Sequence, residues 1–539
     1  MPQRGMLGTA VALALSTVVV EASSQSIQST TLPAGARVVG GQATVTQSGA
    51  AMSIQQSSAR AALDWQSFNI GSQASVTFNQ PSSSAIALNR VLGAGASEIY
   101  GHLSANGQVF LINPNGVLFG RGAEVNVGGL VASTLDMSAA DFMSGRYVLR
   151  GNGAAGTIVN QGAIRTSARG SVALVAPRVQ NAGTIEAPQG AVSLVAANAA
   201  TVEYLADGLV QIRVDQGALQ AELDNSGVLR ADGGSVTLSA KALDSLARSV
   251  INNSGIIEAR SVENANGVVR LAGDDVTLQS SSIVSAAGGG QVEIYGSQVL
   301  ADGLIDASST ARGGSIKLLG DNVGVVGTAR IDASGDLGGG QILVGGNFRG
   351  TGPEPNATAV YVGRDVQLDA SARTSGDGGR VVVWSDQATR FYGEITATGG
   401  ARGGDGGSVE VSGGAWLDFA GRVDTHAPFG ATGSLLLDPA NITISTNATS
   451  GGTCPSVGPC FLLLPTSSVA NLNVTQLTNA LANTNVSVNT SSVPGTGNGD
   501  IFVNTPVTYT STHTLSLTAD RNINIANALT NGGTGAINL

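Results

Sequence analysis

Charged residues are scarce in this chain. They make up 12% of its 539 positions, about half the usual share in soluble domains. Only two of them are lysines, Lys241 and Lys317, and the formal net charge is −10. Because a nucleic-acid-binding surface needs clustered lysine and arginine, this composition argues against nucleic acid as a partner.

Cysteine and histidine are also rare. The two cysteines, Cys454 and Cys460, lie six positions apart, and none of the three histidines is near them in sequence. A small disulfide loop is the natural interpretation in an oxidising compartment, whereas a metal site has too few candidate ligands. We therefore expect a disulfide between these cysteines, no metal and no cofactor.

Long apolar runs are missing as well, with one exception at the N-terminus. Residues 6–20 are almost wholly apolar, they follow a positive charge at Arg4, and small residues stand at Val20 and Ala22. This pattern is typical of a secretory signal peptide, and about 15 apolar residues are too few for a membrane span of about 20. The sequence therefore predicts export, with residues 1–22 removed and a mature chain that begins at Ser23.

Glycine is the residue type in excess, with 75 copies, and no Gly-X-Y period indicates a collagen helix. Glycine recurs in a repeat that has two halves. The first half is a turn with asparagine and glycine, followed by a short run of alternating apolar and polar residues. The second half is another glycine, followed by another such run. Later copies, such as Ile305–Ala307, Ile331–Ala333 and Ile395–Ala397, keep the alternating run and lose the asparagine. The first half of the repeat stands at Asn160–Ile164, Asn181–Ile185, Asn225–Leu229 and Asn253–Ile257.

Each repeat places apolar side chains on one face of two short strands. One unit cannot bury that face by itself, but stacked units bury a continuous core. A period of about 21 to 28 residues fits one coil of a β-helix, whereas a β-propeller blade needs about 40. We therefore predict an all-β fold, a right-handed parallel β-helix (β-solenoid) with an N-terminal cap and small β elements outside the helix.

Two short stretches depart from the strand pattern. Ala242–Ala247 suits a short helix, and Val474, Leu477 and Leu481 have helical spacing. Beyond about residue 440 the composition shifts to Asn, Thr and Ser, and the chain stops at Leu539 inside a strand pattern. Since the ends of a solenoid need caps, we expect this sequence to be the N-terminal part of a longer protein.

The least repetitive part of the chain lies between Leu63 and Asp136, where the cap is expected. It contains the runs Leu63–Gly71, Val76–Pro81, Leu103–Gly120 and Val127–Thr134, and the third of these includes Asn113-Pro114-Asn115-Gly116. These residues closely resemble the secretion domain of two-partner secretion exoproteins, the filamentous haemagglutinin and high-molecular-weight adhesin family. The resemblance extends over roughly residues 30–300.

This resemblance implies an export route and a partner. Such proteins cross the inner membrane by the general secretory route and stay unfolded in the periplasm. There the POTRA domains of a dedicated outer-membrane β-barrel transporter recognise the N-terminal domain, which then nucleates the β-helix outside the cell. By the family's pattern, the secretion motif consists of Asn113, Pro114, Asn115 and Gly116, with Asn69 and Asn89 as further candidates.

The resemblance also implies a secreted or surface-exposed adhesin of a Gram-negative bacterium, and not an enzyme. A downstream region would bind a glycan or protein receptor on a host cell or surface. The chain then divides into a signal peptide (1–22), the cap and core of the secretion domain (23–150), the first coils that complete this domain (151–300), glycine-rich repeats (301–440) and an Asn/Thr-rich region (441–539).

Three alternatives stay open. Asn-Pro-Asn-Gly is also a good turn sequence with a glycine exit, so the motif either contacts the transporter or only shapes the cap. The whole protein is either an adhesin or a cytolysin or contact-dependent toxin whose active part lies beyond Leu539. A β-helical polysaccharide-active enzyme is the third alternative, although the carboxylates are dispersed and only three tryptophans are present.

Overall fold

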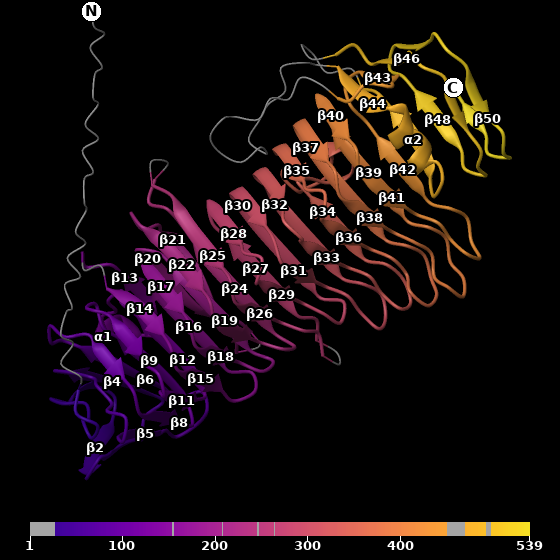
Figure 1. The fold of residues 1–539 in the computed structure, drawn as a ribbon. Helices are drawn as coiled ribbons and strands as arrows, with labels where there is room; N and C mark the ends of the chain where they lie inside the picture. Colours follow the sequence, from indigo (N-terminus) through magenta and orange to yellow (C-terminus); the bar gives the residue numbers. More distant parts are fainter. Residues whose placement is uncertain are drawn as a thin grey trace, which may run out of the picture.

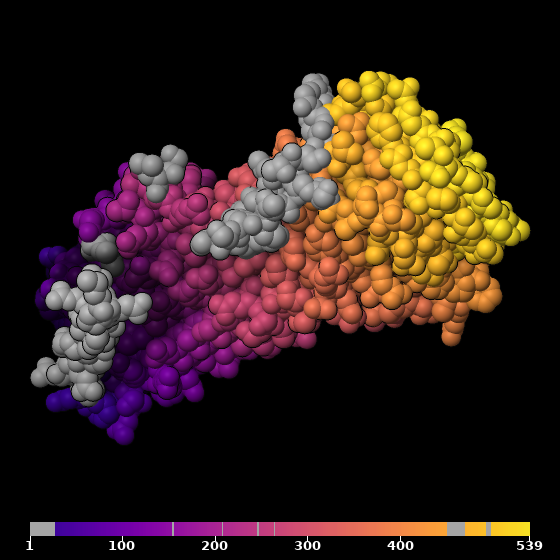
Figure 2. Space-filling view, turned by 45° about the horizontal axis from the view of Figure 1, so that its top comes forward, coloured from indigo at the N-terminus to yellow at the C-terminus, as the bar shows by residue number. Residues whose placement is uncertain are grey.

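The computed structural model describes residues 27–153, 156–206, 208–244, 247–262, 265–449, 469–491 and 497–539. The predicted signal peptide (1–22) and the predicted disulfide between Cys454 and Cys460 lie outside these residues. The described chain forms one elongated body in which the coils follow each other in sequence order (Figure 1). Figure 2 shows the same order on the surface, from the indigo N-terminal end to the yellow C-terminal end.

Most coils carry short strands on three faces, and each strand pairs in parallel with its counterpart on the next coil. The third face is a 15-stranded sheet. The first and second faces belong to one 27-stranded sheet, because β30 (Gln291–Ala301), β32 (Ser315–Val325) and β37 (Arg380–Phe391) each pair with strands of both. The predicted all-β, parallel β-helix is therefore confirmed.

The strands of the N-terminal half are distributed over the three faces as follows. The first face holds β4 (Arg60–Trp65), β6 (Ile86–Val91), β9 (Gln108–Ile112), β12 (Gly129–Ser133), β16 (Ser171–Ala176), β19 (Ala191–Ala196), β24 (Ser235–Ala240) and β27 (Val268–Ala272). The second face holds β7 (Ser97–Ile99), β10 (Val117–Phe119), β14 (Thr157–Asn160), β17 (Arg178–Asn181), β22 (Ala221–Asn225), β25 (Ser249–Asn253) and β28 (Asp275–Leu278). The third face holds β5 (Ser75–Asn79), β8 (His102–Ala105), β11 (Glu124–Val127), β15 (Ala163–Thr166), β18 (Thr184–Glu186), β23 (Val228–Arg230), β26 (Ile256–Glu258) and β29 (Ile283–Ser285).

The core is continuous because equivalent apolar residues pair in register from coil to coil. On the third face, Ile164 pairs with Ile185, and Ile185 pairs with Leu229. All three side chains are fully buried. Alternation within each strand directs these residues inward and their polar neighbours outward, as the repeat predicts.

A ladder of hydrogen-bonded asparagines runs along the C-terminal ends of four strands of the second face. The Nδ2 of Asn160 donates to the Oδ1 of Asn181 at 2.8 Å, Asn181 donates in the same way to Asn225 at 2.8 Å, and Asn225 donates to Asn253 at 2.7 Å. All four amides are buried. The ladder ends where Asn253 pairs with Leu278, so the loss of asparagine from the later repeats marks its last step.

The excess of glycine has a structural reason at the turn that leads into a strand of the first face. A Cβ on Gly190 would lie 1.8 Å from the carbonyl oxygen of Gly170, and one on Gly234 would lie 1.9 Å from that of Gly190. Successive coils therefore approach through backbone alone at this corner. The same contact recurs further along the rod, between Gly379 and Gly340.

The N-terminal end has its own cap. Strand β1 (Arg37–Gly40) pairs antiparallel with β4, and β2 (Ala43–Ser48) forms an antiparallel hairpin with β3 (Ala51–Gln56). Outside the β-helix lies a three-stranded antiparallel sheet, whose strands are β13 (Val148–Arg150), β20 (Ala199–Tyr204) and β21 (Val210–Gln216). It lies beside helix α1 (Ala139–Met143), so both the predicted cap and the predicted β elements outside the helix are present (Figure 1).

One of the two predicted helices is confirmed, and the other is wrong in the part that is described. Helix α2 spans Val474–Ala480. Ala242, in contrast, forms a parallel β-bridge with Ala218, because an extended backbone lets the segment continue the stacking between coils. No helix among the described residues has the length and apolar character needed to cross a membrane.

Three coils of the third face are longer than the predicted period. Val125 and its partner Ile164 are 39 positions apart, because the chain between them includes helix α1 and strand β13. Ile185 and its partner Leu229 are 44 positions apart, because the chain between them includes strands β20 and β21. Ile331 and its partner Leu368 are 37 positions apart, because this coil contains an insertion at residues 345–356.

Candidate functional site

The Asn-Pro-Asn-Gly motif forms the corner between β9 on the first face and β10 on the second. The Gly116 N–H donates to the carbonyl oxygen of Asn113 at 3.1 Å, which closes a four-residue turn. Gly116 has a φ of +125°, a backbone conformation that favours glycine over other residues. The turn that the sequence predicts is therefore present.

Asn113 points into the protein and is fully buried. Its Nδ2 donates to the Gly95 carbonyl at 3.0 Å and to the Ser97 hydroxyl at 3.0 Å. Its Oδ1 accepts from the backbone N–H of Asn115 at 3.0 Å. In the folded chain this side chain has a structural role, since both ends of its amide bind the chain's own groups.

Asn115 lies on the outside of the same turn. Its side chain is exposed, although the Nδ2 donates to the Gly93 carbonyl at 2.9 Å. Pro114 is half-buried beside it, and Leu92, at the start of the contacted loop, is 60% exposed. Asn115 is thus the residue of the motif whose side chain a partner of the folded domain can reach.

The two further candidates, Asn69 and Asn89, lie at different depths. Asn69 is half-buried, and its Oδ1 accepts from the Glu98 N–H on β7 at 2.9 Å. Asn89 is fully buried on β6, where its Oδ1 accepts from the Trp65 indole at 3.0 Å. The structure therefore brings Asn69, Asn113 and Asn115 together on the segment 93–98, and it places Asn89 in a separate contact.

A buried ion pair fixes the first coils to the cap. Asp64 is 4% exposed, and its carboxylate accepts from the guanidinium of Arg90 at 2.6 Å and from that of Arg37 at 3.1 Å. These contacts join β1, β4 and β6. Because removal of one partner of a buried charge is costly, Asp64 fixes the cap strand β1 to the first two strands of the first face.

The outer side of the first face is apolar at this end of the rod. Leu88 pairs with Phe110, and Phe110 pairs with Val131, all with outward-pointing side chains that are nevertheless buried. The cover is α1 and the chain that follows it, whose Phe142 and Tyr147 rings lie 5.9 and 5.7 Å from the ring of Phe110. The sheet is therefore packed on both sides here.

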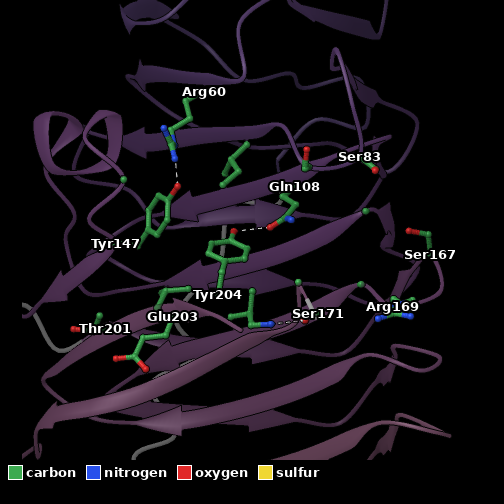
Figure 3. A pocket seen from close by; sticks show the side chains of 18 of the residues that line it. Arg60, Ser83, Gln108, Tyr147, Ser167, Arg169, Ser171, Thr201, Glu203 and Tyr204 are labelled. Atoms are coloured by element: carbon green, nitrogen blue, oxygen red, sulfur yellow. Dashed lines mark hydrogen bonds between the residues drawn. The ribbon is translucent and has the colours of Figure 1, made fainter. Parts of the chain in front are cut away.

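Between this cover and the β-helix lies a groove of about 1010 Å³ (Figure 3). The Arg60 Nε donates to the Tyr147 hydroxyl at 2.8 Å, and the Tyr204 hydroxyl donates to the Gln108 Oε1 at 2.5 Å. Burial raises the pKa of Tyr204 far above its usual value, so this phenol stays protonated. Of the described residues that line the groove, Glu203 is the one carboxylate, and it pairs with Arg213 at 2.7 Å.

The site residues that the sequence analysis did not single out are those of this outer layer. Two signals in the sequence point to them. The apolar run Val109–Ile112 does not alternate, which is typical of a strand covered on both faces. The runs Thr201–Tyr204 and Val210–Val214 alternate on either side of Gly208, which has a φ of +85° and suits a hairpin.

Comparison with known proteins agrees with this architecture. The family model described as "TPS secretion domain", for two-partner secretion, matches residues 29–294. The crystal structure of the HMW1 secretion domain from Haemophilus influenzae is 31% identical in sequence, with a TM-score of 0.58, and the similarity covers 74% of this chain and 100% of that one. The chain belongs to the two-partner secretion family. Members of this family are exported to the cell surface or secreted, and their TPS domain implies a dedicated outer-membrane transporter.

Two curated relatives match over the same part of the chain. A heme/hemopexin-binding protein of Haemophilus influenzae strain Rd is 35% identical over 264 residues, which are 47% of this chain and 28% of the relative. A second heme/hemopexin-binding protein from Haemophilus influenzae is 31% identical over 274 residues, 46% of this chain and 28% of the relative. The match thus spans little more than a quarter of the length of these relatives.

Proposed function

We propose that the chain is the N-terminal part of a filamentous haemagglutinin-like adhesin, secreted or surface-exposed on a Gram-negative bacterium. In this proposal the TPS domain is both the secretion signal and the folding nucleus. The POTRA domains of the transporter recognise the domain in the periplasm, and the β-helix downstream holds a receptor-binding region away from the cell. The role is one of binding, without catalysis.

The observation that carries the secretion role is the division of labour within the motif. Asn113 uses its whole amide to hold the segment 93–98, whereas Asn115 keeps an exposed side chain at the same corner. In this proposal Asn113 shapes the cap, and Asn115 is offered to the transporter by the local turn Asn113–Gly116, which forms before the β-helix does. The proposal thus combines the two interpretations of the motif and assigns each to its own position.

The parallel register supports the role of folding nucleus. Every coil of the described β-helix offers its strand edges to the next, and the antiparallel cap covers the N-terminal end of the stack. A coil that emerges from the transporter can pair at once with the formed one, so folding propagates from the N-terminus.

A binding function is favoured over the alternatives by the curated relatives, whose printed names describe binding proteins. A receptor of protein or glycan type on a host cell or surface fits an exported rod. A cytolysin or contact-dependent toxin is the second candidate, in which a different downstream region would be carried by the same secretion domain.

Substitutions in the motif test the proposal. We expect Asn115→Ala to lower the extracellular yield about tenfold, the effect of losing about 1.4 kcal/mol of contact with the transporter. Its free energy of unfolding should fall by about 1 kcal/mol, since the Nδ2 loses two partly buried hydrogen bonds, to the Gly93 carbonyl and to the Asn113 Oδ1. Asn113→Ala should instead lower the free energy of unfolding by about 3 kcal/mol, because buried partners lose their hydrogen bonds.

The measurements are the amounts of chain in medium and periplasm, together with urea unfolding of the purified variants. Asn126→Ala is the matched control, because Asn126 is an exposed asparagine on the third face, away from the motif. An Asn115→Ala variant with the yield of this control would remove Asn115 from the transporter contact. A loss of yield that follows stability across all variants would leave the motif with a structural role alone.

A further inference from the structure

The outer side of the first face changes character along the rod. In its middle part the outward residues are charged, and Arg270, Glu293 and Lys317 occupy equivalent positions on successive coils. The Arg270 and Glu293 side chains form an ion pair at 2.8 Å. Further on, beyond the matched TPS domain, the equivalent positions become apolar again. The apolar ones are Leu343 on β34 (Gln341–Val344), Val382 on β37 and Leu436 on β42 (Ser434–Leu437), and Glu410 on β39 (Ser408–Gly413) lies between the last two.

The insertion at residues 345–356 covers the start of this second apolar stretch. Its Glu354 binds Lys317 of the charged stretch at 3.1 Å and accepts from the Asn347 amide at 2.7 Å. Its Gly350 lies against Trp384 so closely that a Cβ would stand 2.6 Å from the indole ring. The insertion is therefore docked on the sheet at two points.

One residue in the apolar stretch is a carboxylic acid. Glu410 is 1% exposed, and its Oε2 accepts from the backbone N–H of Arg349 at 2.9 Å. Its Oε1 is buried and has no hydrogen-bond partner among the described residues. Arg349 reaches it with a φ of +53°, a left-handed conformation that costs a non-glycine residue about 1 to 2 kcal/mol. A strained backbone thus satisfies one oxygen of a buried carboxyl and leaves the other without a donor.

The unpartnered oxygen belongs to a residue that lines a cavity of about 310 Å³ under the edge of the insertion. The apolar part of its lining includes Val382 and Leu436, and the polar part includes the hydroxyls of Ser408, Ser434 and Ser487. A volume near 300 Å³ is at the lower end of the range for small-molecule sites.

Two arginines stand at one side of this cavity. The guanidinium groups of Arg349 and Arg380 lie 5.5 and 5.9 Å from the centroid of the Phe348 ring, and both residues line the cavity. Neither arginine forms a salt bridge within the part of the chain that the structure describes. Guanidinium groups bind carboxylates with two parallel hydrogen bonds, so the pair offers a place for an anionic group.

We infer that this cavity binds an acidic sugar unit, a small polyhydroxylated ring that carries one carboxylate. The carboxylate lies at Arg349 and Arg380, a ring hydroxyl meets the Oε1 of Glu410, and the apolar face of the ring packs on Leu436. The ligand's carboxylate then meets two arginines that form no salt bridge in the described chain, and its hydroxyl meets an oxygen that has no hydrogen-bond partner there. The site would give the rod a glycan-binding function of its own, separate from the TPS domain.

The protonation of Glu410 gives this binding a pH dependence. The pKa of Glu410 is raised to about 7, mainly by burial and also by the negative charge of Asp438, while the contacts with Arg349 and Ser412 limit the rise. The ionised form would repel the ligand's carboxylate, so the protonated form is the one that binds. Affinity is therefore full below pH 7 and is lost as the pH rises through 7, by about tenfold between pH 6 and pH 8.

The test uses the full chain and D-glucuronate as the probe, titrated by isothermal calorimetry or saturation-transfer NMR at pH 6 and pH 8. D-Glucose is the matched ligand without the carboxylate. We expect glucuronate to bind at least tenfold more tightly than glucose at pH 6. Arg380→Gln should weaken glucuronate binding about tenfold, as expected for the loss of one charged hydrogen bond. Arg422→Gln, on the exposed outer side of the third face, is the control variant.

Glu410→Gln removes the titratable carboxyl and keeps the shape of the side chain, since glutamine has a hydrogen-bonding group of the same size. This variant should still bind glucuronate at pH 6, and its affinity should be the same at pH 8. Equal binding of glucuronate and glucose, no binding of either, or an Arg380→Gln variant that binds like the Arg422→Gln control would overturn the assignment. A pH dependence that persists in Glu410→Gln would also contradict it.

Discussion

Replacement of Gly190 by alanine is expected to lower the free energy of unfolding by about 3 kcal/mol, the upper part of the range for overpacked sites. The added Cβ would lie 1.8 Å from the carbonyl oxygen of Gly170 on the preceding coil. That oxygen belongs to the backbone, so it cannot move aside as a flexible side chain would. The two coils must separate locally, and the hydrogen bonds between β16 and β19 must lengthen.

Urea unfolding followed by circular dichroism measures this effect. Gly95→Ala is the matched control, because a Cβ at the exposed Gly95 would meet nothing within 4 Å. We expect the control to unfold within about 0.5 kcal/mol of the unchanged chain. A Gly190→Ala chain as stable as this control would mean that the coils do not approach through backbone at this corner.

Removal of one rung from the middle of the asparagine ladder should have an effect of similar size. Asn181→Ala leaves the Nδ2 of Asn160 without an acceptor and the Oδ1 of Asn225 without a donor, both in buried positions. Each buried group left without its partner costs about 1 to 3 kcal/mol. We therefore expect the free energy of unfolding to fall by about 3 kcal/mol, measured by the same urea titration.

The end of the ladder provides the internal comparison. Asn253→Ala leaves one ladder group unpaired, the Nδ2 of Asn225, so its expected cost is about half that of Asn181→Ala. Equal effects at the two positions would show that the asparagines act independently and do not form a ladder. An Asn181→Ala chain of unchanged stability would show that water replaces the missing amide.

The repeat units made the coils predictable because strand alternation and stacking are both local in the sequence. Once Ile164, Ile185 and Leu229 are seen as equivalent, their parallel register follows, and so does the burial of each. The asparagines at Asn160 and Asn181 were visible in the same way. Their chain of hydrogen bonds follows from stacking identical amides at one corner.

The outer layers were less predictable, because they depend on contacts between residues far apart in the chain. Arg60 meets Tyr147, and Tyr204 meets Gln108, 96 positions away. No repeat relates these residues to each other. The signal that was available is indirect: the outward residues Leu88 and Phe110 are apolar, which requires a cover but does not say which segment supplies it.

The candidate motif was likewise predictable in part: its turn follows from the sequence, and its long-range contacts do not. The sequence predicts the turn at Asn113–Gly116, and in the structure Asn113 lies on the same inward side as Val109 and Leu111. The partners of its amide, the Gly95 carbonyl and the Ser97 hydroxyl, come from the preceding coil and were not predictable from the motif. The distinction between a buried Asn113 and an exposed Asn115 therefore needed the structure.

The role of the TPS domain is tested most directly by the amount of folded chain that reaches the medium of Gram-negative cells with and without its dedicated outer-membrane transporter. With the transporter present, the account predicts protease-resistant chain outside the cells. Without it, the chain should accumulate in the periplasm. Equal amounts in the medium of both cell types would contradict transporter-dependent export and, with it, the function assigned to the N-terminal domain.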